Sequence, residues 1–153
     1  MKTLIDNKKS RFEYHLEEFF EAGIALEGWE VKSLLTGRGS LNEAYVRILG
    51  DEVALIGAHI TPTSQYSKFS NLDPIRTRKL LLNRSEINKL IGKVQISGFT
   101  LVPVRLYYKN RRLKLEIALA KGKKLRDKRD DIKKRDIDRE VRQSIKTNAR
   151  SLE

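Results

Sequence analysis

The sequence lacks cysteine altogether, and it contains only two histidines in 153 residues. Without cysteine the chain cannot form a disulfide, use a thiolate nucleophile or bind zinc through sulfur. His15 and His59 are too few for a histidine-based metal site. The composition therefore predicts a protein without metal or cofactor, and the missing cysteine fits a reducing compartment.

Long hydrophobic runs are also missing. No apolar run approaches the ~18 residues that a membrane span requires. The N-terminus, MKTLIDNKKSRFEYHLEE, becomes charged too early for a signal peptide. We therefore expect a cytoplasmic protein with no membrane partner.

What the chain has in excess is positive charge, with 32 Lys+Arg against 20 Asp+Glu and a net charge of +12. Such an excess favours polyanionic partners, and nucleic acid first. The charge is concentrated near the end, where residues 121–150 carry 13 Lys+Arg and 6 Asp+Glu. We expect three parts: a loose basic arm over 1–11, an RNA-binding body over 12–120, and a basic tail over 121–153.

The body has the pattern of a β protein. Expected strands and helices are joined by short turns, with a long exposed loop over 61–78. The strands are predicted at 12–26 (with a bulge or turn near Ala22-Gly23), 43–49, 52–60, 97–109 and 111–121, and the helices at 28–37 and after an N-cap at Ser85. Hairpin turns are expected at Gly50-Asp51 and at 109–111. The fold class is therefore mainly β, an OB-like antiparallel barrel with two to three short helices.

The last predicted strand alternates clearly between two faces. Leu113, Leu115, Ile117 and Leu119 point one way, whereas Arg112, Lys114 and Glu116 point the other way. This pattern is typical of a half-buried strand with one wet, basic face. In the preceding strand, Pro103 predicts an edge or bulge position.

The tail has a narrow helical stripe of aliphatic residues and acid-before-base pairs four residues apart, such as Asp130–Lys134. Each pair adds roughly 0.2–0.5 kcal/mol to an isolated helix, too little to hold it formed. Two interpretations stay open. The tail is either a segment that becomes helical on a polyanionic partner or a solvated helix that lies on the body.

No motif in the sequence predicts catalysis. Glu17, Glu18 and Glu21 cluster in sequence, but on a strand they do not converge as a metal site or a general acid would require. AKGKK lacks the context of a phosphate-binding loop. We expect no enzyme activity.

Binding features are stronger than catalytic ones. Basic clusters alternate with aromatic residues, a combination that suits RNA because cations attract phosphates and rings stack on bases. The clusters are Arg76, Arg78, Lys79; Arg111, Arg112, Lys114; and Lys121, Lys123, Lys124, interleaved with Tyr14, Tyr107 and Tyr108. The alternative is that the charges form a solvated face and the rings belong to the core.

Several runs taken together resemble one family. NKKSRFEYHLEEFFEAGIALEGWEVKSL, DPIRTRKLLLN, TLVPVRLYYKN and LAKGKKLRDKRDDIKKRD are similar to the small protein B family, the SsrA-binding proteins that partner transfer-messenger RNA (tmRNA). The resemblance runs from about Asn7 to Arg150. It implies an OB-like barrel and a role in trans-translation, in which the protein holds the tRNA-like domain of tmRNA and enters stalled 70S ribosomes. Elongation factor Tu and alanyl-tRNA synthetase act on the same RNA.

The resemblance also implies site residues. RNA contacts are expected from Asn7, Lys8, Tyr14, Glu21, Leu81, Asn83 and Lys114, and the basic pattern adds Arg11. Glu21 is expected to accept hydrogen bonds from RNA donors, which no lysine can do. The tail is expected to contact the decoding centre and the empty mRNA channel of the small ribosomal subunit through Arg126, Asp127, Lys128, Arg129, Lys133, Lys134 and Arg135.

Two positions depart from the family pattern. Arg126 stands where relatives often have His or Tyr, and a guanidinium can also stack on a base. Leu35 stands where relatives often have Arg, which removes one candidate phosphate contact. Two other functions are weighed beside the family's: a general RNA-binding ribosomal or translation protein, and a nuclease.

Overall fold

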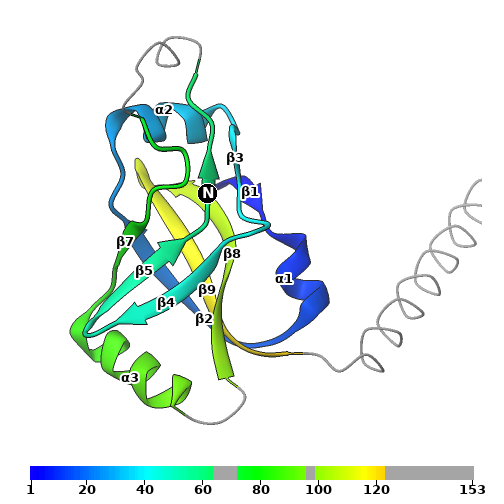
Figure 1. Cartoon of the computed structure of the whole chain (residues 1–153), viewed down its shortest axis with the longest axis vertical. Helices are drawn as coiled ribbons and strands as arrows, with labels where there is room; N and C mark the ends of the chain where they lie inside the picture. Colours follow the sequence, from blue (N-terminus) through cyan, green and yellow to red (C-terminus); the bar gives the residue numbers. More distant parts are fainter. Residues whose placement is uncertain (64–71, 96–98, 123–153) are drawn as a thin grey trace, which may run out of the picture. The chain divides into compact units, whose positions relative to one another are not determined.

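The computed structural model describes residues 1–63, 72–95 and 99–122. In these ranges most consecutive strands and helices are joined by hairpins or other short connections (Figure 1). The elements are β1 (Lys2–Asp6), α1 (Lys8–Glu13), β2 (Tyr14–Ile24), α2 (Gly28–Leu35), β3 (Gly39–Ser40), β4 (Tyr45–Leu49), β5 (Glu52–Ile56), β6 (His59–Ile60), β7 (Arg78–Leu81), α3 (Arg84–Val94), β8 (Phe99–Lys109) and β9 (Arg112–Gly122). All of them belong to one unit, Met1–Gly122. The predicted tail from Lys123 onward lies outside the described residues.

An antiparallel sheet organises this unit. Its seven strands run in the order β1-β8-β9-β2-β7-β5-β4, and β3 pairs with β6 in a separate two-stranded sheet. The mainly β class with short helices is therefore confirmed. Within the described ranges no hydrogen-bonded ladder joins the edge strands β1 and β4, so the sheet is not closed by backbone pairing.

The N-terminus corrects one prediction. Residues 1–11 were expected to form a loose arm because they are polar and basic. They instead form β1, which pairs with β8 from Lys2↔Tyr108 to Asp6↔Arg105, and most of α1. Backbone pairing explains the difference, because an edge strand is held by main-chain hydrogen bonds that do not depend on an apolar sequence.

Both predicted hairpin turns are confirmed. Gly50, between β4 and β5, has φ +67°, a conformation that glycine adopts without steric cost. Between β8 and β9, Asn110 and Arg111 have φ +52° and +63°, so two consecutive residues are left-handed. This is the backbone of a two-residue hairpin turn that follows the twist of the strands.

The two predicted helices form, but one cap was assigned to the wrong residue. Ser85 was expected to cap the second helix, whereas the cap is Asn83, two residues earlier, and α3 starts at Arg84. The Asn83 backbone N–H donates to Glu86 Oε1 at 3.3 Å, which completes a capping box. In α2 the same motif is formed by Glu27 and Glu30, and the Glu27 N–H donates to Glu30 Oε1 at 2.7 Å.

Two β-bulges bend the long strands. In β2 the bulge lies between Leu16 and Glu18, earlier than the predicted position near Ala22-Gly23. In β8 it lies between Pro103 and Arg105, as proline predicted, although β8 is flanked on both sides by β1 and β9. The missing N–H of Pro103 is therefore accommodated by the bulge rather than by an edge.

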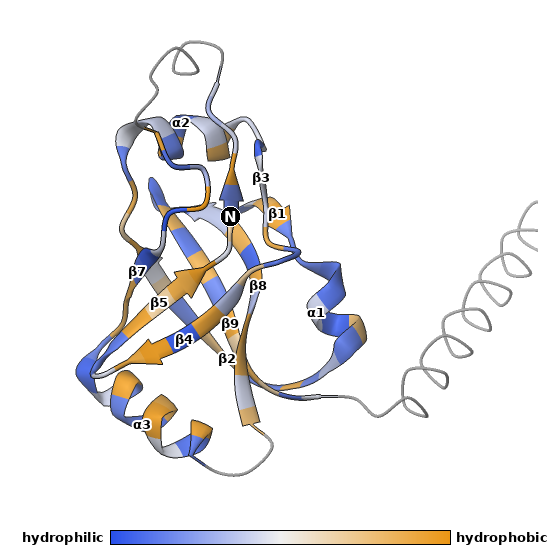
Figure 2. Ribbon diagram, in the orientation of Figure 1, coloured by the Kyte–Doolittle hydropathy of each residue, from blue (hydrophilic) through white to orange (hydrophobic). Residues whose placement is uncertain are grey.

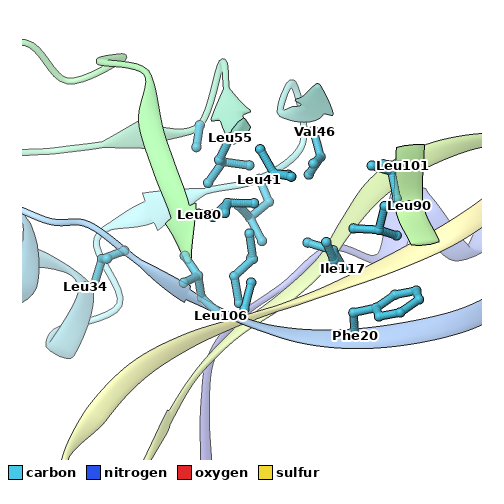
Figure 3. Packing of buried hydrophobic residues seen from close by; sticks show 14 of the residues in the cluster. Phe20, Leu34, Leu41, Val46, Leu55, Leu80, Leu90, Leu101, Leu106 and Ile117 are labelled. Carbon is cyan, nitrogen blue, oxygen red and sulfur yellow. The ribbon is translucent and has the colours of Figure 1, made fainter. Parts of the chain in front are cut away.

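The main core fills the inner side of the sheet. Side chains from the long strands and from α2 and α3 meet there, and Figure 3 shows Phe20, Leu80, Leu106 and Ile117 among them. Leu115, Ile117 and Leu119 are fully buried, which confirms the predicted apolar face of the last strand. Figure 2 shows the hydrophobic residues along β4 and β5 and the mostly hydrophilic surface of α1.

A buried ion cluster ties α2 to the start of β7. The Glu30 carboxylate, which is inaccessible to solvent, forms ion pairs with two arginines: Arg78 Nη2 lies 2.6 Å and Arg76 Nη2 2.5 Å from its oxygens. Arg78 also donates to the carbonyl oxygens of Ala58 at 2.6 Å and Pro74 at 3.1 Å. These contacts satisfy the guanidinium internally, as a buried charge requires.

Candidate nucleic-acid interface

The outward side of β2, β9 and β8 carries the polar residues that the sequence placed on a wet face. Gly23 pairs with Lys114 and Lys114 with Tyr107, while Glu21 pairs with Glu116 and Glu116 with Arg105. Paired residues project to the same side of a sheet. We call this surface, defined by Glu21, Arg105, Tyr107, Lys114 and Glu116, the open face.

At the opposite end of β8 and β9, the outward side of the sheet is covered by other residues. Val102, Val104, Ala118 and Ala120 form a second, smaller cluster against which Tyr14 and Leu16 pack. The predicted alternation of β9 therefore holds up to Glu116, after which small residues replace the polar ones and both sides of the strand are buried. The helix α1 packs against β2 and β8.

Glu21 is the acidic centre of the open face. Its Oε2 accepts a short hydrogen bond from the Tyr107 hydroxyl and a second one from Lys109 Nζ at 3.3 Å. The Tyr107 hydrogen bond, aided by Lys109 and Lys114 and opposed by desolvation, holds the pKa of Glu21 below its usual range. Glu21 is consequently an ionised hydrogen-bond acceptor at neutral pH, surrounded by cations.

Next to it, Arg105 and Glu116 form a half-buried ion pair, with Arg105 Nε 3.2 Å from Glu116 Oε1. The Arg105 guanidinium also lies over the Tyr107 ring, 5.2 Å from its centroid. These contacts leave Arg105 already engaged within the protein. Lys114 acts on Glu21 through electrostatic attraction, and within the described ranges it forms no ion pair with an acid.

A groove of about 410 Å³ opens beside Lys114, at the end of the sheet where the β8–β9 hairpin turns. Apolar side chains line it and arginines border it, a combination that accepts a base against its floor and phosphates at its rim. The lining residues are Gly23, Ile24, Leu26, Val31, Leu81, Tyr108, Arg111, Arg112, Leu113 and Lys114.

Leu81 projects from β7 at this groove, with 53% of its surface exposed. It pairs with Gly23, and a Cβ atom at position 23 would lie 3.2 Å from the Leu81 Cβ. Glycine therefore lets the leucine side chain lie directly against the β2 backbone. Asn83, two residues later, is exposed at the N-terminus of α3.

The residues predicted near the N-terminus lie around α1, on a different part of the surface. Lys8, Arg11 and Lys121 are exposed and Tyr14 is half-buried. Asn7 is only 4% exposed, donates from Nδ2 to the Pro103 carbonyl at 2.8 Å and anchors the bulge of β8. Lys121 lies in β9, with its Nζ 4.5 Å from the Phe99 ring centroid.

The structure corrects the prediction for the cluster at 76–79. Arg78 was expected to contact RNA, but it is fully buried and bound to Glu30. Arg76 is partly exposed and shares the same carboxylate. Lys79 points outward, where its Nζ lies 3.2 Å from Glu52 Oε1. Alternation along β7 explains the split, because neighbouring strand residues face opposite sides.

Sequence reasoning missed three contributors to this site: Lys109, Gly23 and the role of Tyr107 as a partner of Glu21. Tyr107 was noted only as an aromatic beside basic residues. The two residues are 86 positions apart in sequence, and only the pairing of β2, β9 and β8 brings them together. Gly23 carried a usable signal, since an isolated glycine in a strand often marks a close approach.

The other predicted residues cannot be placed. Lys123, Lys124 and the ribosome-contacting set Arg126, Asp127, Lys128, Arg129, Lys133, Lys134 and Arg135 lie outside the described residues. Among the residues that are described, no group of three or more His, Asp or Glu side chains could hold a metal ion. None of the helices formed by these described residues is long and apolar enough to cross a membrane.

An antiparallel sheet with exposed cations beside an apolar groove that includes Tyr108 is typical of proteins that bind oligonucleotides on a sheet surface. Comparison with known proteins narrows this class. The family model of the SmpB protein matches residues 4–147. The chain belongs to the SmpB family.

Its relatives are similar over most of their length. The SsrA-binding protein of Burkholderia lata is 59% identical over 138 residues, 90% of this chain and 93% of the relative. The SsrA-binding protein of Burkholderia vietnamiensis is 57% identical over the same shares. A solved structure, "tmRNA-SmpB: a journey to the center of the bacterial ribosome", has 40% identity and a TM-score of 0.65, covering 78% of this chain and 84% of that one.

Proposed function

We propose that this protein binds the tRNA-like domain of tmRNA and delivers it to stalled bacterial ribosomes for trans-translation. Membership of the SmpB family, relatives named SsrA-binding protein and a structural neighbour named for tmRNA and the ribosome support this function. The observation that carries it is the open face: an ionised carboxylate, Glu21, lies between cations beside an apolar groove.

This arrangement suits structured RNA better than a simple polyanion. Lys114 and the arginines of the hairpin attract phosphates, whereas Glu21 repels them and accepts from N–H or O–H donors. The groove offers Leu81 and Tyr108 to an unstacked base. An RNA must therefore present phosphates, a donor group and a base in one fixed arrangement, which favours a folded loop over an arbitrary single strand.

Competition binding tests the proposal. Labelled tRNA-like domain is bound to the full-length protein in the presence of excess bulk tRNA, and we expect binding to resist the competitor. Glu21→Ala should lower the affinity, whereas Glu18→Ala, on the same strand but paired with Lys89 of α3, should not. Equal competition by bulk tRNA would contradict the proposal and leave a general RNA-binding protein.

The RNA-contacting residues are part of this proposal. We assign Glu21, Leu81, Asn83 and Lys114 to the open face and its groove, and Lys8, Arg11, Tyr14 and Lys121 to the surface around α1. Lys79 and Arg76 lie outside the residues that line the groove and are proposed as additional phosphate contacts. Asn7 acts by holding α1 against β8. The relatives' similarity, at 57–59%, supports a shared site.

The basic tail from Lys123 onward is proposed to bind the small ribosomal subunit and to detect whether its mRNA channel is empty. Its cations suit the ribosomal RNA of the decoding centre and of an mRNA channel that is empty, where resident message would exclude it. The residues proposed for these contacts are Arg126, Asp127, Lys128, Arg129, Lys133, Lys134 and Arg135. Elongation factor Tu and alanyl-tRNA synthetase would act on the same RNA.

The curved sheet serves as an OB-type barrel, a view supported by β4 lying beside β8 without a backbone ladder between them. The protein works in the cytoplasm, where ribosomes are. It performs no chemistry itself, and metal-dependent cleavage of labelled RNA would contradict this.

A further inference from the structure

The starting observation is the environment of Tyr107. Its ring is only 2% exposed, because it lies between Thr3 of β1 and Lys114 of β9, its partners across the sheet. Arg105 lies over the ring, and the hydroxyl reaches the Glu21 carboxylate. A buried tyrosine held on all sides is a rigid hydrogen-bond donor.

The second observation is how the two oxygens of Glu21 differ. Tyr107 and Lys109 both donate to Oε2. In the part of the chain that the structure describes, no hydrogen bond or ion pair of Glu21 falls on Oε1. The Glu21 side chain is 40% exposed, so one oxygen is held by the protein and the other remains available to a ligand.

An unsupported glutamate on a strand would sample several rotamers, and binding would have to freeze them. A hydrogen bond from a rigid phenol removes much of this freedom before the ligand arrives, and preorganisation of this kind increases affinity. The same bond favours the ionised form of the carboxylate, and both lone pairs of Oε1 can then accept hydrogen bonds.

We propose that Tyr107 is a positioning residue for RNA recognition: it fixes Glu21 so that Oε1 accepts a hydrogen bond from a donor group of the RNA. The donor is an exocyclic amino group of a base or a ribose 2′-hydroxyl, since a phosphate would be repelled. This inference rests on the proposed function, because it refines how the open face selects its RNA.

Tyr107→Phe tests the role directly. Phenylalanine keeps the buried ring and its contact with Arg105 but removes the hydroxyl. We expect the affinity for the tRNA-like domain to fall about tenfold, because a hydrogen bond to a charged group is lost. Thr36→Val is the control for loss of a hydroxyl: Thr36 lies at the end of α2, outside the open face, its groove and the surface around α1, and this change should leave the affinity unchanged.

A double-mutant cycle separates positioning from structural damage. In a Glu21→Ala background, Tyr107→Phe should change the affinity less than about twofold, because no carboxylate remains to be positioned. The same tenfold loss in both backgrounds would overturn the inference while leaving the proposed function intact. If Glu21→Ala alone leaves binding unchanged, the proposed use of the open face fails instead.

A second readout does not depend on RNA. In an NMR titration of the Glu21 side-chain carboxyl, Tyr107→Phe should raise the pKa of Glu21 toward its ordinary value, and Thr36→Val should leave it unchanged. A tyrosine that contributes only its buried ring would not alter this titration in a protein that remains folded. An unchanged Glu21 titration in Tyr107→Phe would contradict the positioning role.

The nature of the donor is tested with altered RNA. Copies of the tRNA-like domain carry either 2′-deoxyribose or bases without an exocyclic amino group at single positions. We expect one position where the change weakens binding to the wild-type protein but not to Glu21→Ala. The kind of change that weakens binding at this position identifies the donor as a ribose hydroxyl or a base amino group. The absence of any such position would overturn the proposal.

Discussion

Glu21 and Lys114 face the same side of neighbouring strands but contribute differently to binding. Lys114 offers a charge that any phosphate satisfies, so it contributes affinity without sequence information. Glu21 needs a donor at one place, so it contributes selectivity. Because the two residues project from the paired strands β2 and β9, the distance between the charges is set by the sheet.

Lys114→Ala should weaken RNA binding and make it less salt-dependent. Loss of one phosphate contact reduces the slope of log K against log salt by about 1 and acts alike on specific and bulk RNA. Fluorescence anisotropy at several salt concentrations measures both effects. Lys93→Ala on α3 is the charge-matched control, and an unchanged slope for Lys114→Ala would remove this residue from the site.

Gly23→Val should lower RNA affinity through Leu81. Any Cβ at position 23 lies 3.2 Å from the Leu81 Cβ, so valine pushes the leucine out of its place in the groove. Gly92→Ala, on α3 where an added Cβ meets open space, serves as the control and should instead stabilise the protein by about 0.5–1 kcal/mol. Full RNA affinity in Gly23→Val would show that Leu81 does not contact RNA.

At the scale of the elements, periodicity predicted more than composition did. Alternation in 111–121 and the glycine at position 50 were enough to predict β9 and the β4–β5 hairpin, because these signals are local. β1 could not be predicted in this way, since its partner is β8, about 100 residues further on. For the site, the sequence predicted which residues are charged but not which of them are buried in ion pairs. Arg78 and Lys79 are adjacent in sequence, and only the fold decides that Arg78 is the buried one.

The ion cluster around Glu30 predicts a strong effect on stability. Glu30→Gln removes the negative charge that neutralises two arginines, one of which is fully buried. We expect a loss of about 3–5 kcal/mol in the free energy of unfolding. Urea denaturation at pH 7 measures it. Glu43→Gln, in a weak exposed pair with Lys9, should stay within about 0.5 kcal/mol of wild type.

The same cluster predicts a pH dependence. Burial would raise the pKa of Glu30, but hydrogen bonds and attraction from Arg76 and Arg78 outweigh it and lower the pKa below the ordinary value of 4.5. The ionised Glu30 therefore contributes its full stability above that pH and loses it as the pH falls toward the lowered pKa. The difference between wild type and Glu30→Gln should shrink below about pH 4.5. A constant difference down to pH 3 would contradict this.

At the scale of the whole molecule, the body and the tail should be separable in function. The sequence placed the boundary at 121, but β9 continues to Gly122, so the chain should be cut after that residue. A protein of residues 1–122 should keep most of its affinity for the tRNA-like domain, while tagging of stalled chains in a reconstituted translation system stops. A large loss of affinity with tagging intact would reverse the assignment of the two parts.

The pairing of β1 with β8 also constrains how the chain is made. Asn7 binds the Pro103 carbonyl, which is 96 positions later in the sequence. Likewise, β2 pairs with β9, the last strand of the sheet to be synthesised. During synthesis the first strands therefore emerge from the ribosome long before their partners exist, and the central ladders form only when nearly the entire body has been translated. A copy interrupted before residue 99 would have no β8 or β9 and no assembled sheet centre, so a truncated product of this gene would be a substrate for proteolysis rather than a weakened form of the protein.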